Sequence, residues 1–223
     1  MTRLAIFDCD GTMVDGQANI CAAMERAFAA EGLAPPDHHQ TRRIVGLSLA
    51  EAMHALAPDL DEAQRARLAD HYRTAFQTLR ARGDLTEPLY DGLVELLQRL
   101  READWLCAVA TGKSDRGLRF VLEHHQLSEH FISLQTADRH PSKPHPSMIL
   151  QALDDAGAEP AHATMIGDTS FDMVMAINAG VRPIGVDWGY HDAHELHEAG
   201  ADHVVTSMEA LFAVLMEEDT HGR

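Results

Sequence analysis

The strongest constraint on this chain lies near its start, where the apolar run LAIF at residues 4–7 is followed at once by DCDGT at residues 8–12. An apolar run that ends in two acids and a glycine is typical of a buried strand that opens into a polar loop. Open α/β sheets bind their ligands at the carboxyl ends of strands, where this loop would lie. There Asp8 could act as a nucleophile and Asp10 could move protons, while a divalent cation screens their mutual repulsion.

These aspartates do not fit a calcium loop. An EF-hand loop that began at Asp8 would have glycine at its sixth position and glutamate at its twelfth. Those positions hold Met13 and Asn19. On this motif alone, a strand followed by a solvated acidic turn stays open as the simpler interpretation.

Strand and helix patterns alternate along the chain after residue 89. Apolar residues at positions 93, 96, 97 and 100, for example, share one face of a helix. This alternation predicts a three-layer α/β/α, Rossmann-like core, with a parallel sheet covered by helices on both faces. We expect helices over 91–103, 114–125, 146–156, 169–179 and 208–216, and strands over 106–110, 131–135, 163–166, 182–186 and 203–205.

The segment between residues 17 and 83 breaks this alternation, because it contains no convincing strand. Helical patterns cover 18–30, 48–57 and 61–82, with Ser48 as an N-cap and Gly83 suited to a helix end. We therefore expect a small α-helical cap domain, residues 16–83, inserted after the first strand. The catalytic core would then comprise 1–15 and 84–223, with glycines near both junctions that could act as hinges.

Three later segments carry polar residues at the expected carboxyl edge. Thr111 and Gly112 follow the strand at 106–110, Lys143 stands in the proline-flanked turn KPHP, and the strand at 163–166 runs into GDTSFD, which contains Asp168 and Asp172. A P-loop is excluded, because the required glycine five residues before Gly112 is a cysteine. From these segments alone, Thr111 could also be an ordinary helix cap. Asp172 could likewise be an acid in the first turn of a helix, where the helix dipole favours it.

Together and in this order, the four motifs resemble those of the haloacid dehalogenase-like hydrolase superfamily. The chain is similar to its phosphatases with a small helical cap (subfamily IA), which include phosphoglycolate phosphatases and β-phosphoglucomutases, and the resemblance covers essentially the whole chain. It implies hydrolysis of a phosphomonoester through an aspartyl-phosphate, with Mg²⁺ as the cofactor. Asp10 argues against the true dehalogenases, because a halide leaving group needs no proton.

The resemblance also implies the roles of the motif residues. Asp8 would attack phosphorus, and Asp10 would protonate the leaving alcohol and then activate water. Thr111 and Gly112 would hold the phosphate, and Lys143 would neutralise it and pair with Asp8. We expect the neighbouring Lys113 to face solvent.

The metal site implied by the resemblance contains Asp8, the backbone carbonyl of Asp10, Asp168 and Asp172. Hard oxygen ligands of this kind suit Mg²⁺. Asp168 would ligate the ion directly. Whether Asp172 ligates, binds through water or orients Lys143 stays open, and so does the isomer of the peptide bond before Pro144, which could be cis.

The substrate would be selected by the cap, because the core motifs contact only the phosphoryl group. In the segment TRRIVGLS at 41–48, Arg42 and Arg43 could bind a carboxylate through their planar guanidinium groups. Because 2-phosphoglycolate carries a carboxylate, it is the substrate that we predict first. Alternatively, one or both arginines could be solvated charges on a helix. The segment WGY at 188–190 could wall the site or be ordinary loop packing.

Three other functions stay open at this point. A phosphomutase of the β-phosphoglucomutase type would use the same Asp8 but return the phosphoryl group to a sugar. A pyrophosphatase is closely related in chemistry. A non-catalytic module on the same fold is the third, against which the full set of motif residues argues.

Composition bounds the partners and the compartment. The formal net charge is −17, from 35 Asp and Glu against 18 Lys and Arg, which argues against nucleic acid or an anionic membrane and leaves a small phosphorylated metabolite as the expected partner. Monomer and dimer both stay open. Three cysteines without metal-type spacing and the lack of a signal or membrane-spanning segment predict a reducing, cytoplasmic location. We interpret the 15 histidines, including His191, His194 and His197, as surface residues rather than metal ligands.

Overall fold

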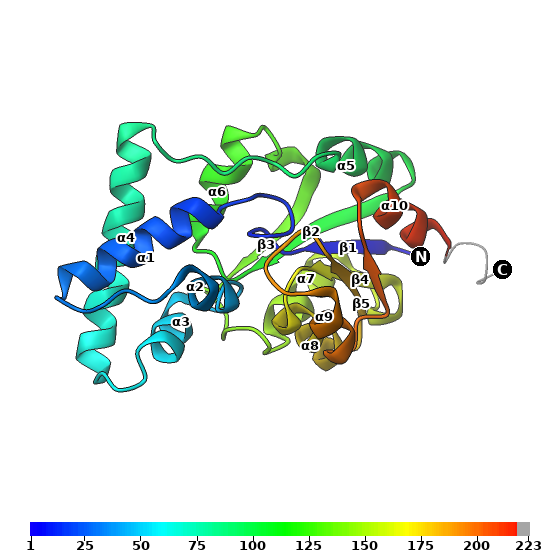
Figure 1. Ribbon diagram of the computed structural model, residues 1–223. Coiled ribbons are helices and arrows are strands. Elements are labelled where there is room, and N and C mark those ends of the chain that lie inside the picture. The colour runs from blue at the N-terminus through cyan, green and yellow to red at the C-terminus, as the bar shows by residue number, and fades with distance from the viewer. Residues whose placement is uncertain (218–223) are drawn as a thin grey trace.

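The computed structural model describes residues 1–217 and contains a six-stranded parallel sheet in the order β3-β2-β1-β4-β5-β6 (Figure 1). The strands are β1 (Arg3–Phe7), β2 (Trp105–Thr111), β3 (Phe131–Thr136), β4 (Ala163–Gly167), β5 (Arg182–Val186) and β6 (His203–Val205). The helices are α1 (Gln17–Ala30), α2 (His38–Arg43), α3 (Leu49–Leu56), α4 (Glu62–Arg82), α5 (Leu93–Glu102), α6 (Asp115–His124), α7 (Ser147–Ala156), α8 (Ser170–Ala179), α9 (Ala193–Glu198) and α10 (Met208–Glu217).

Strand β1 is central and fully enclosed. Residues Leu4 to Phe7 have no exposed surface, as expected for a strand that is covered on both faces. On one side Ala5 pairs with Cys107 of β2, and on the other it pairs with Thr164 of β4. The loops that follow β1, β2 and β4 therefore leave the same edge of the sheet next to one another.

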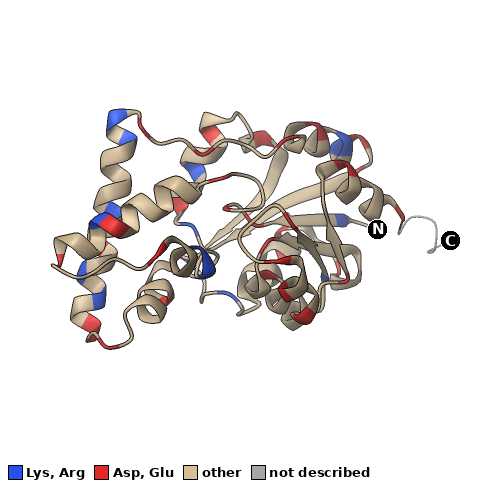
Figure 2. Ribbon diagram, in the orientation of Figure 1, with Lys and Arg blue, Asp and Glu red and all other residues tan. Residues whose placement is uncertain are grey.

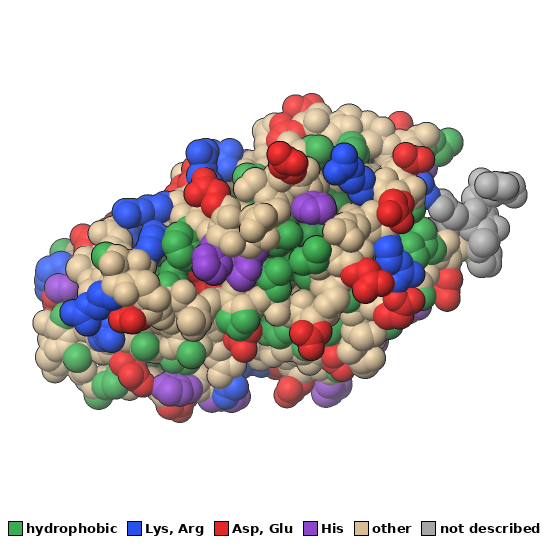
Figure 3. Space-filling view, turned by 90° about the horizontal axis from the view of Figure 1, so that it is seen from above, with side chains coloured by type: hydrophobic (Ala, Val, Ile, Leu, Met, Phe, Trp, Pro, Cys, Tyr) green, Lys and Arg blue, Asp and Glu red, His purple; other side chains and the backbone are tan. Residues whose placement is uncertain are grey.

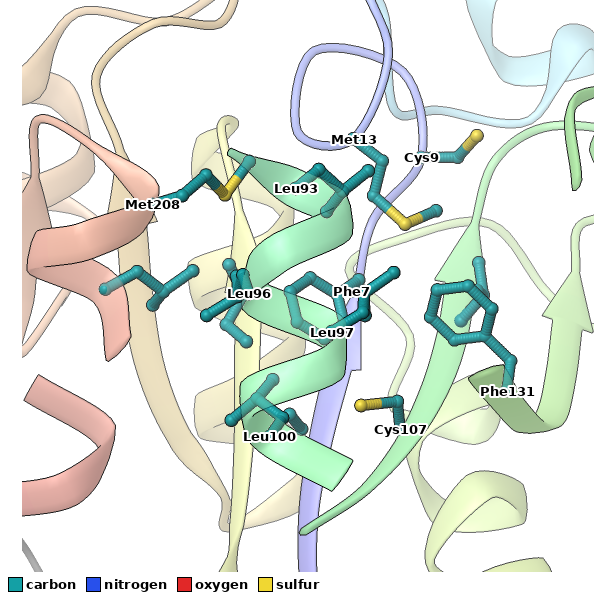
Figure 4. Close-up of a cluster of buried hydrophobic side chains, with 14 of the residues drawn as sticks. Phe7, Cys9, Met13, Leu93, Leu96, Leu97, Leu100, Cys107, Phe131 and Met208 are labelled. Atoms are coloured by element: carbon teal, nitrogen blue, oxygen red, sulfur yellow. The ribbon is translucent and has the colours of Figure 1, made fainter. Parts of the chain in front are cut away.

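One face of the sheet is covered by α5, α6 and α10. The four leucines expected on one face of a helix, at positions 93, 96, 97 and 100, are all buried in α5 and point toward Phe7 and Cys107 (Figure 4). Helix α6 adds Leu118, Val121 and Leu122 to the same cluster. Burial of each such side chain contributes about 1.5–3 kcal/mol relative to exposure, so this face is a principal source of stability.

The other face of the sheet is covered by α7 and α8. Met148 and Ile149 of α7 and Ala176 of α8 pack with Leu4 and Ile6 of β1. Because alternate residues of β1 point to opposite faces, this short strand contributes to both clusters. The prediction of a three-layer α/β/α core is confirmed.

Helices α1 to α4 lie between β1 and β2 in the chain and stand beside the carboxyl edge of the sheet (Figure 1). Helices α1, α3 and α4 share a hydrophobic cluster of their own that includes Met24, Phe28, Met53 and Leu68. This cluster accounts for a helical segment that is stabilised separately from the sheet. The expected boundaries at 16–83 stay a prediction.

The expected strands and the longer helices are present, with ends that differ by one or two residues. Two short helices, α2 and α9, were not expected. Six residues are too few to show a hydrophobic period. Both begin with a capping box, Asp37 with Gln40 and Asp192 with Glu195, and this local signal could have revealed them.

Within residues 1–217, no helix combines the length and the apolar character needed to cross a bilayer. Cys9, Cys21 and Cys107 are free and buried. Each behaves as a small apolar side chain in the packing.

Candidate active site

The motif residues meet at the carboxyl edge of the sheet. Asp8 follows β1, Asp168 follows β4 and Asp172 lies in the first turn of α8. Each offers a carboxylate oxygen within 4.8 Å of those of the other two, and all three residues are buried. The parallel register explains the meeting, because β1 and β4 are hydrogen-bonded neighbours that end side by side.

Lys143 is the cation of this cluster. Its side chain has no exposed surface, and its Nζ lies 2.9 Å from Asp8 Oδ1 and 2.6 Å from Asp172 Oδ1. A lysine is almost never buried unless it is paired. Burial alone would lower the pKa of Lys143, but the two carboxylates outweigh it and raise the pKa above its ordinary value. The peptide bond between Lys143 and Pro144 is cis.

The two oxygens of Asp8 differ. Oδ1 accepts a hydrogen bond from the backbone N–H of Cys9 at 2.7 Å and contacts Lys143. Oδ2 is buried and has no hydrogen-bond partner among residues 1–217. Burial raises the pKa of Asp8 to about 6, against the opposing effect of Lys143. One oxygen is thus held in place while the other is free to attack or to bind a cation.

Asp168 is fixed by two donors from different loops. Thr12 Oγ1 donates to Asp168 Oδ1 at 2.8 Å, and the backbone N–H of Tyr190 donates to Oδ2 at 2.9 Å. Burial, with the neighbouring Asp8 and Asp172 charges, raises the pKa of Asp168 well above its usual value. Three carboxylates with one buried ammonium and one orphaned oxygen are a suitable set for a divalent cation with oxygen ligands, such as Mg²⁺.

The roles of Thr12 and Tyr190 were not predicted. Thr12 belongs to the first motif, and its position two residues after Asp10 is the only sequence signal for it. The segment 188–190 was expected to wall the site or to pack as a loop. It contacts the first motif directly, because Trp188 Nε1 donates to the carbonyl of Thr12 at 3.2 Å.

Asp172 positions Lys143. Its Oδ1 receives Lys143, and its Oδ2 accepts hydrogen bonds from the backbone N–H of Thr169 at 3.1 Å and from Thr169 Oγ1 at 2.6 Å. The same contacts form the capping box of α8. Of the alternatives left open for Asp172, its contacts favour orientation of Lys143.

Asp10 is not part of the carboxylate cluster, and both of its carboxylate oxygens accept hydrogen bonds from Lys113. Lys113 Nζ lies 2.7 Å from Asp10 Oδ1 and 2.8 Å from Glu87 Oε1, and only 10% of its side chain is exposed. The expectation that Lys113 faces solvent was wrong. Two acids that are distant in sequence outweigh its burial and hold the pKa of Lys113 well above its ordinary value.

Thr111 and Gly112 stand beside the two aspartates of the first motif. Thr111 is buried, and its Oγ1 accepts from the backbone N–H of Lys113 at 3.2 Å, which leaves its own proton available for an anion. A Cβ at Gly112 would collide with the backbone carbonyl oxygens of Gly46 and Leu47. Gly112 is therefore the point of closest approach between β2 and the segment that follows α2.

A cavity of about 470 Å³ opens from this edge of the sheet. Asp8, Asp10, Thr111, Gly112 and Lys113 line one part of it. The rest is lined mainly by α1, the segment 44–52, α4 and the start of α6. The arrangement offers a nucleophile, a second carboxylate and phosphate-binding donors at the end of a site with room for an organic group.

The structure places Arg42 and Arg43 outside this cavity. Arg42 Nε donates to the carbonyl of His38 at 3.3 Å, within α2. The Arg43 guanidinium forms an ion pair with Glu195 of α9. The cavity is instead lined by Arg73, Arg80 and Arg116. The assignment of Arg42 and Arg43 to substrate binding stays a prediction without support from these contacts.

Most histidines reach the surface, and several are visible among acidic, basic and apolar side chains in Figure 3. His191 is an exception to the expectation, because it is only 3% exposed. Its Nδ1 accepts from the backbone N–H of Ser170 at 3.1 Å, and its Nε2 lies 3.3 Å from the carbonyl oxygen of Arg43. Burial lowers its pKa, which favours the neutral ring that these contacts require.

Comparison with known proteins agrees with this geometry. Residues 5–186 match the family model described as haloacid dehalogenase-like hydrolase. A protein named probable phosphatase IndB from Dickeya dadantii is 35% identical over 89% of this chain and 87% of its own. A phosphoglycolate phosphatase from Agrobacterium fabrum is 31% identical over 98% of this chain and 94% of its own.

Solved structures show the same architecture. One titled as a predicted phosphatase from Clostridium acetobutylicum has a TM-score of 0.87 at 26% identity and covers 97% of this chain and 99% of its own. A hydrolase from Pseudomonas syringae has a TM-score of 0.85 at 28% identity, with the same coverage. The chain therefore belongs to the haloacid dehalogenase-like hydrolase family. Within that family it is a phosphatase, as its named relatives are.

Proposed function

We propose that this phosphatase hydrolyses a small phosphomonoester, with Mg²⁺ as cofactor and an aspartyl-phosphate at Asp8 as intermediate, and that 2-phosphoglycolate is the first substrate to test. The observation that carries the proposal is the state of Asp8. One of its oxygens is held by Lys143 and Cys9, and the other is buried and unpartnered. The phosphoglycolate phosphatase named above, similar over nearly the whole chain, supports the choice of substrate.

The reaction follows from the groups present. Asp8 Oδ2 attacks phosphorus, the bond from phosphorus to the ester oxygen breaks, and Asp10 supplies the proton that the leaving alcohol takes up. Asp10 then accepts a proton from water as the water attacks phosphorus, which releases inorganic phosphate and regenerates Asp8. Thr111 and Gly112 hold the phosphoryl oxygens, and Lys143 neutralises part of their charge.

Asp8, Asp168 and the carbonyl of Asp10 would hold Mg²⁺, and Asp172 would keep Lys143 in place. When bound, the cation screens the repulsion between the phosphoryl group and the carboxylates. The ammonium of Lys113 lies 2.7 Å from Asp10 Oδ1 and holds this carboxylate in place beside the cavity.

The test is phosphate release from 2-phosphoglycolate, pyrophosphate, β-glucose 1-phosphate and several sugar phosphates, with and without Mg²⁺. Asp8→Asn should retain the fold and lose at least about a thousand-fold in kcat, because the covalent route is removed. Thr78→Ser, a conservative change at a half-buried position on α4, is the control for the preparation of variants. Activity retained by Asp8→Asn would contradict the assignment of the nucleophile.

The same panel separates the alternatives. Conversion of β-glucose 1-phosphate to another sugar phosphate without phosphate release would indicate a mutase, and a preference for pyrophosphate would indicate a pyrophosphatase. We propose a cytoplasmic location and a small phosphorylated metabolite as the partner, on the strength of the free cysteines and the acidic composition.

A further inference from the structure

Three arginines line the cavity and have no part in the proposed mechanism, and two of them, Arg80 and Arg116, form no ion pair within residues 1–217. Arg80 lies near the end of α4, and Arg116 lies in the first turn of α6. Both line the cavity that begins at Asp8 and Asp10. Figure 2 shows basic residues (blue) along α4, in a protein whose acids outnumber its Lys and Arg.

Neither arginine has an ion-pair partner within residues 1–217, because no carboxylate there lies in ion-pair distance of either guanidinium group. Arg80 Nε is buried and has no hydrogen-bond partner in the described part of the chain. The nearby Glu87 is bonded to Lys113 at 2.8 Å and is therefore already paired. Leaving a buried donor unpaired costs about 1–3 kcal/mol, which a bound acceptor would recover.

Arg80 contacts an aromatic ring. Its guanidinium carbon lies 4.5 Å from the centre of the Phe120 ring, a cation–π contact that orients the group without using its N–H donors. The charge of Arg116 is close enough to act on Arg80, and together with burial it lowers the pKa of Arg80. Two mutually repelling cations beside a cavity are stabilised by an anion that binds between them.

Other arginines of the helical segment show the contrast. Arg67 pairs with Glu31 at 3.0 Å, Arg73 pairs with Asp70 at 2.7 Å, and Arg43 pairs with Glu195. Four other arginines of this segment also lack an ion pair within residues 1–217, but none of them lines the cavity. Arg80 and Arg116 are the ones on the cavity wall that the fold leaves without such a partner in residues 1–217.

Apolar side chains also line the cavity. They include Ile20, Met24, Leu47, Tyr72 and Phe76. A volume of about 470 Å³ lies within the range of about 300–1,000 Å³ that accommodates ligands much larger than a two-carbon acid. The wall therefore favours an organic group with apolar surface.

We propose that Arg80 and Arg116 bind a second anionic group of the substrate, and that the preferred substrates are phosphomonoesters with an apolar or aromatic body ending in a carboxylate or a second phosphate. The inference rests on the proposed phosphatase function and deepens it. Two planar guanidinium forks suit either anion. 2-Phosphoglycolate has the second anion but lacks the apolar body, so it would use only the anion-binding part of the site.

The test uses three aryl esters that differ in one group. They are 4-carboxyphenyl phosphate, its neutral counterpart 4-carbamoylphenyl phosphate, and 1,4-phenylene bisphosphate. We expect kcat/KM of the wild-type protein with Mg²⁺ to be at least about ten-fold higher for an anionic ester than for the neutral one, mainly through KM, because charge-assisted hydrogen bonds are worth that much. Comparison of the carboxylate and the bisphosphate shows which anion the arginines prefer.

Variants assign the preference to residues. In Arg80→Gln with Arg116→Gln, the ratio of kcat/KM between anionic and neutral esters should fall to within about two-fold, since the uncharged side chains no longer discriminate. Arg119→Gln, an exposed change on α6 outside the cavity, should keep the wild-type ratio. If the double variant does not fold, Arg116→Gln alone serves, because Arg116 is exposed and its loss should reduce the ratio by at least about three-fold.

Four results would overturn the inference. Equal kcat/KM for the carboxyl and carbamoyl esters would contradict the anion site. A preference for the anionic ester that persists in the folded arginine variants would contradict its assignment to Arg80 and Arg116. Both results would leave the phosphatase function intact. If the protein hydrolyses 2-phosphoglycolate in an Asp8-dependent reaction but hydrolyses none of the three aryl esters, the proposed preference for an apolar or aromatic body is contradicted. Absence of Asp8-dependent turnover on any ester would overturn the proposed function itself, and this inference with it.

Discussion

Single residues at the site have their ionisation states set by partners that are distant in the chain. Lys143 is a buried cation because Asp8 and Asp172 surround it, and Lys113 is buried because Asp10 and Glu87 do the same. A buried charge is tolerated only with such partners. Lys143 was predicted from the motifs, whereas Glu87 lies in no motif and Lys113 was expected to face solvent.

Loss of the buried ion pairs that Lys113 forms with Asp10 and Glu87 should lower the stability of the fold. Lys113→Met leaves two buried carboxylates without a cation, and we expect it to lower the free energy of unfolding by about 3–5 kcal/mol in urea titrations. Adding Glu87→Gln should recover part of that loss, because one of the unpaired charges is removed. Arg73→Gln breaks the exposed pair with Asp70 and should cost less than about 1 kcal/mol. A loss in Lys113→Met no larger than this control would show that the pair does not stabilise the fold.

His140 should make stability depend on pH. Its ring contacts Ser147 Oγ at 2.7 Å and Gln135 Oε1 at 2.9 Å, and burial lowers its pKa below the ordinary 6.5. The unfolded chain therefore binds a proton more readily, so the free energy of unfolding should fall as pH drops from about 7.5 through 6.5 toward the folded pKa. Urea titrations across this window should show a smaller fall in His140→Gln than in the wild type.

The exposed His54→Gln serves as the matched control for that series, since its ring lies on the surface of α3. It should follow the wild-type curve. An unchanged pH dependence in His140→Gln would assign the effect to other groups.

At the scale of elements, the strand ends decide where the chemistry lies. The strands and long helices were predicted because their apolar periods are local properties of the sequence. The parallel order that places the end of β1 beside those of β2 and β4 brings Asp8, Thr111 and Asp168 together. Contacts between the helical segment and the core, such as Gly112 against Gly46, have no local signal and were not predicted.

Gly112 should accept no side chain. In Gly112→Ala, the new Cβ would collide with two backbone carbonyls that cannot move independently of the segment 46–47. We expect kcat/KM to fall by about a hundred-fold through displacement of the phosphate-binding groups, measured on the best ester of the panel. Gly157→Ala is the control, because Gly157 has a φ of +60° but open space around it and should lose only about 1 kcal/mol of stability. Wild-type activity in Gly112→Ala would show that the approach is not required.

At the scale of the whole molecule, three carboxylates from different parts of the chain are held together by folding. Asp8, Asp168 and Asp172 repel one another, and Lys143 is the cation that the fold supplies to them. A bound divalent cation should therefore stabilise the folded state as well as serve the reaction. This coupling offers a measurement that is independent of activity.

Mg²⁺ at about one hundred times its Kd should raise the free energy of unfolding by about 2.7 kcal/mol, and chelation should reverse the effect. Thermal unfolding with and without Mg²⁺ measures it. Asp168→Asn should remove the Mg²⁺-dependent rise in Tm, whereas Asp59→Asn, at an exposed position before α4, should retain it. An identical Tm for the wild type in Mg²⁺ and in chelator would contradict the assignment of the cluster as a metal site.

The sequence by itself determined the α/β alternation, the helical segment after the first strand and the motif residues at the strand ends. These are short-range properties, because hydrophobic period and turn chemistry depend on neighbours a few positions apart. Only the tertiary structure decided that Lys113 is buried with Glu87, that Arg43 pairs with Glu195, and that Arg80 and Arg116 line the cavity with no carboxylate of residues 1–217 in ion-pair distance. Each depends on contacts between residues that are distant in the chain, and such long-range contacts leave no periodic pattern in the sequence.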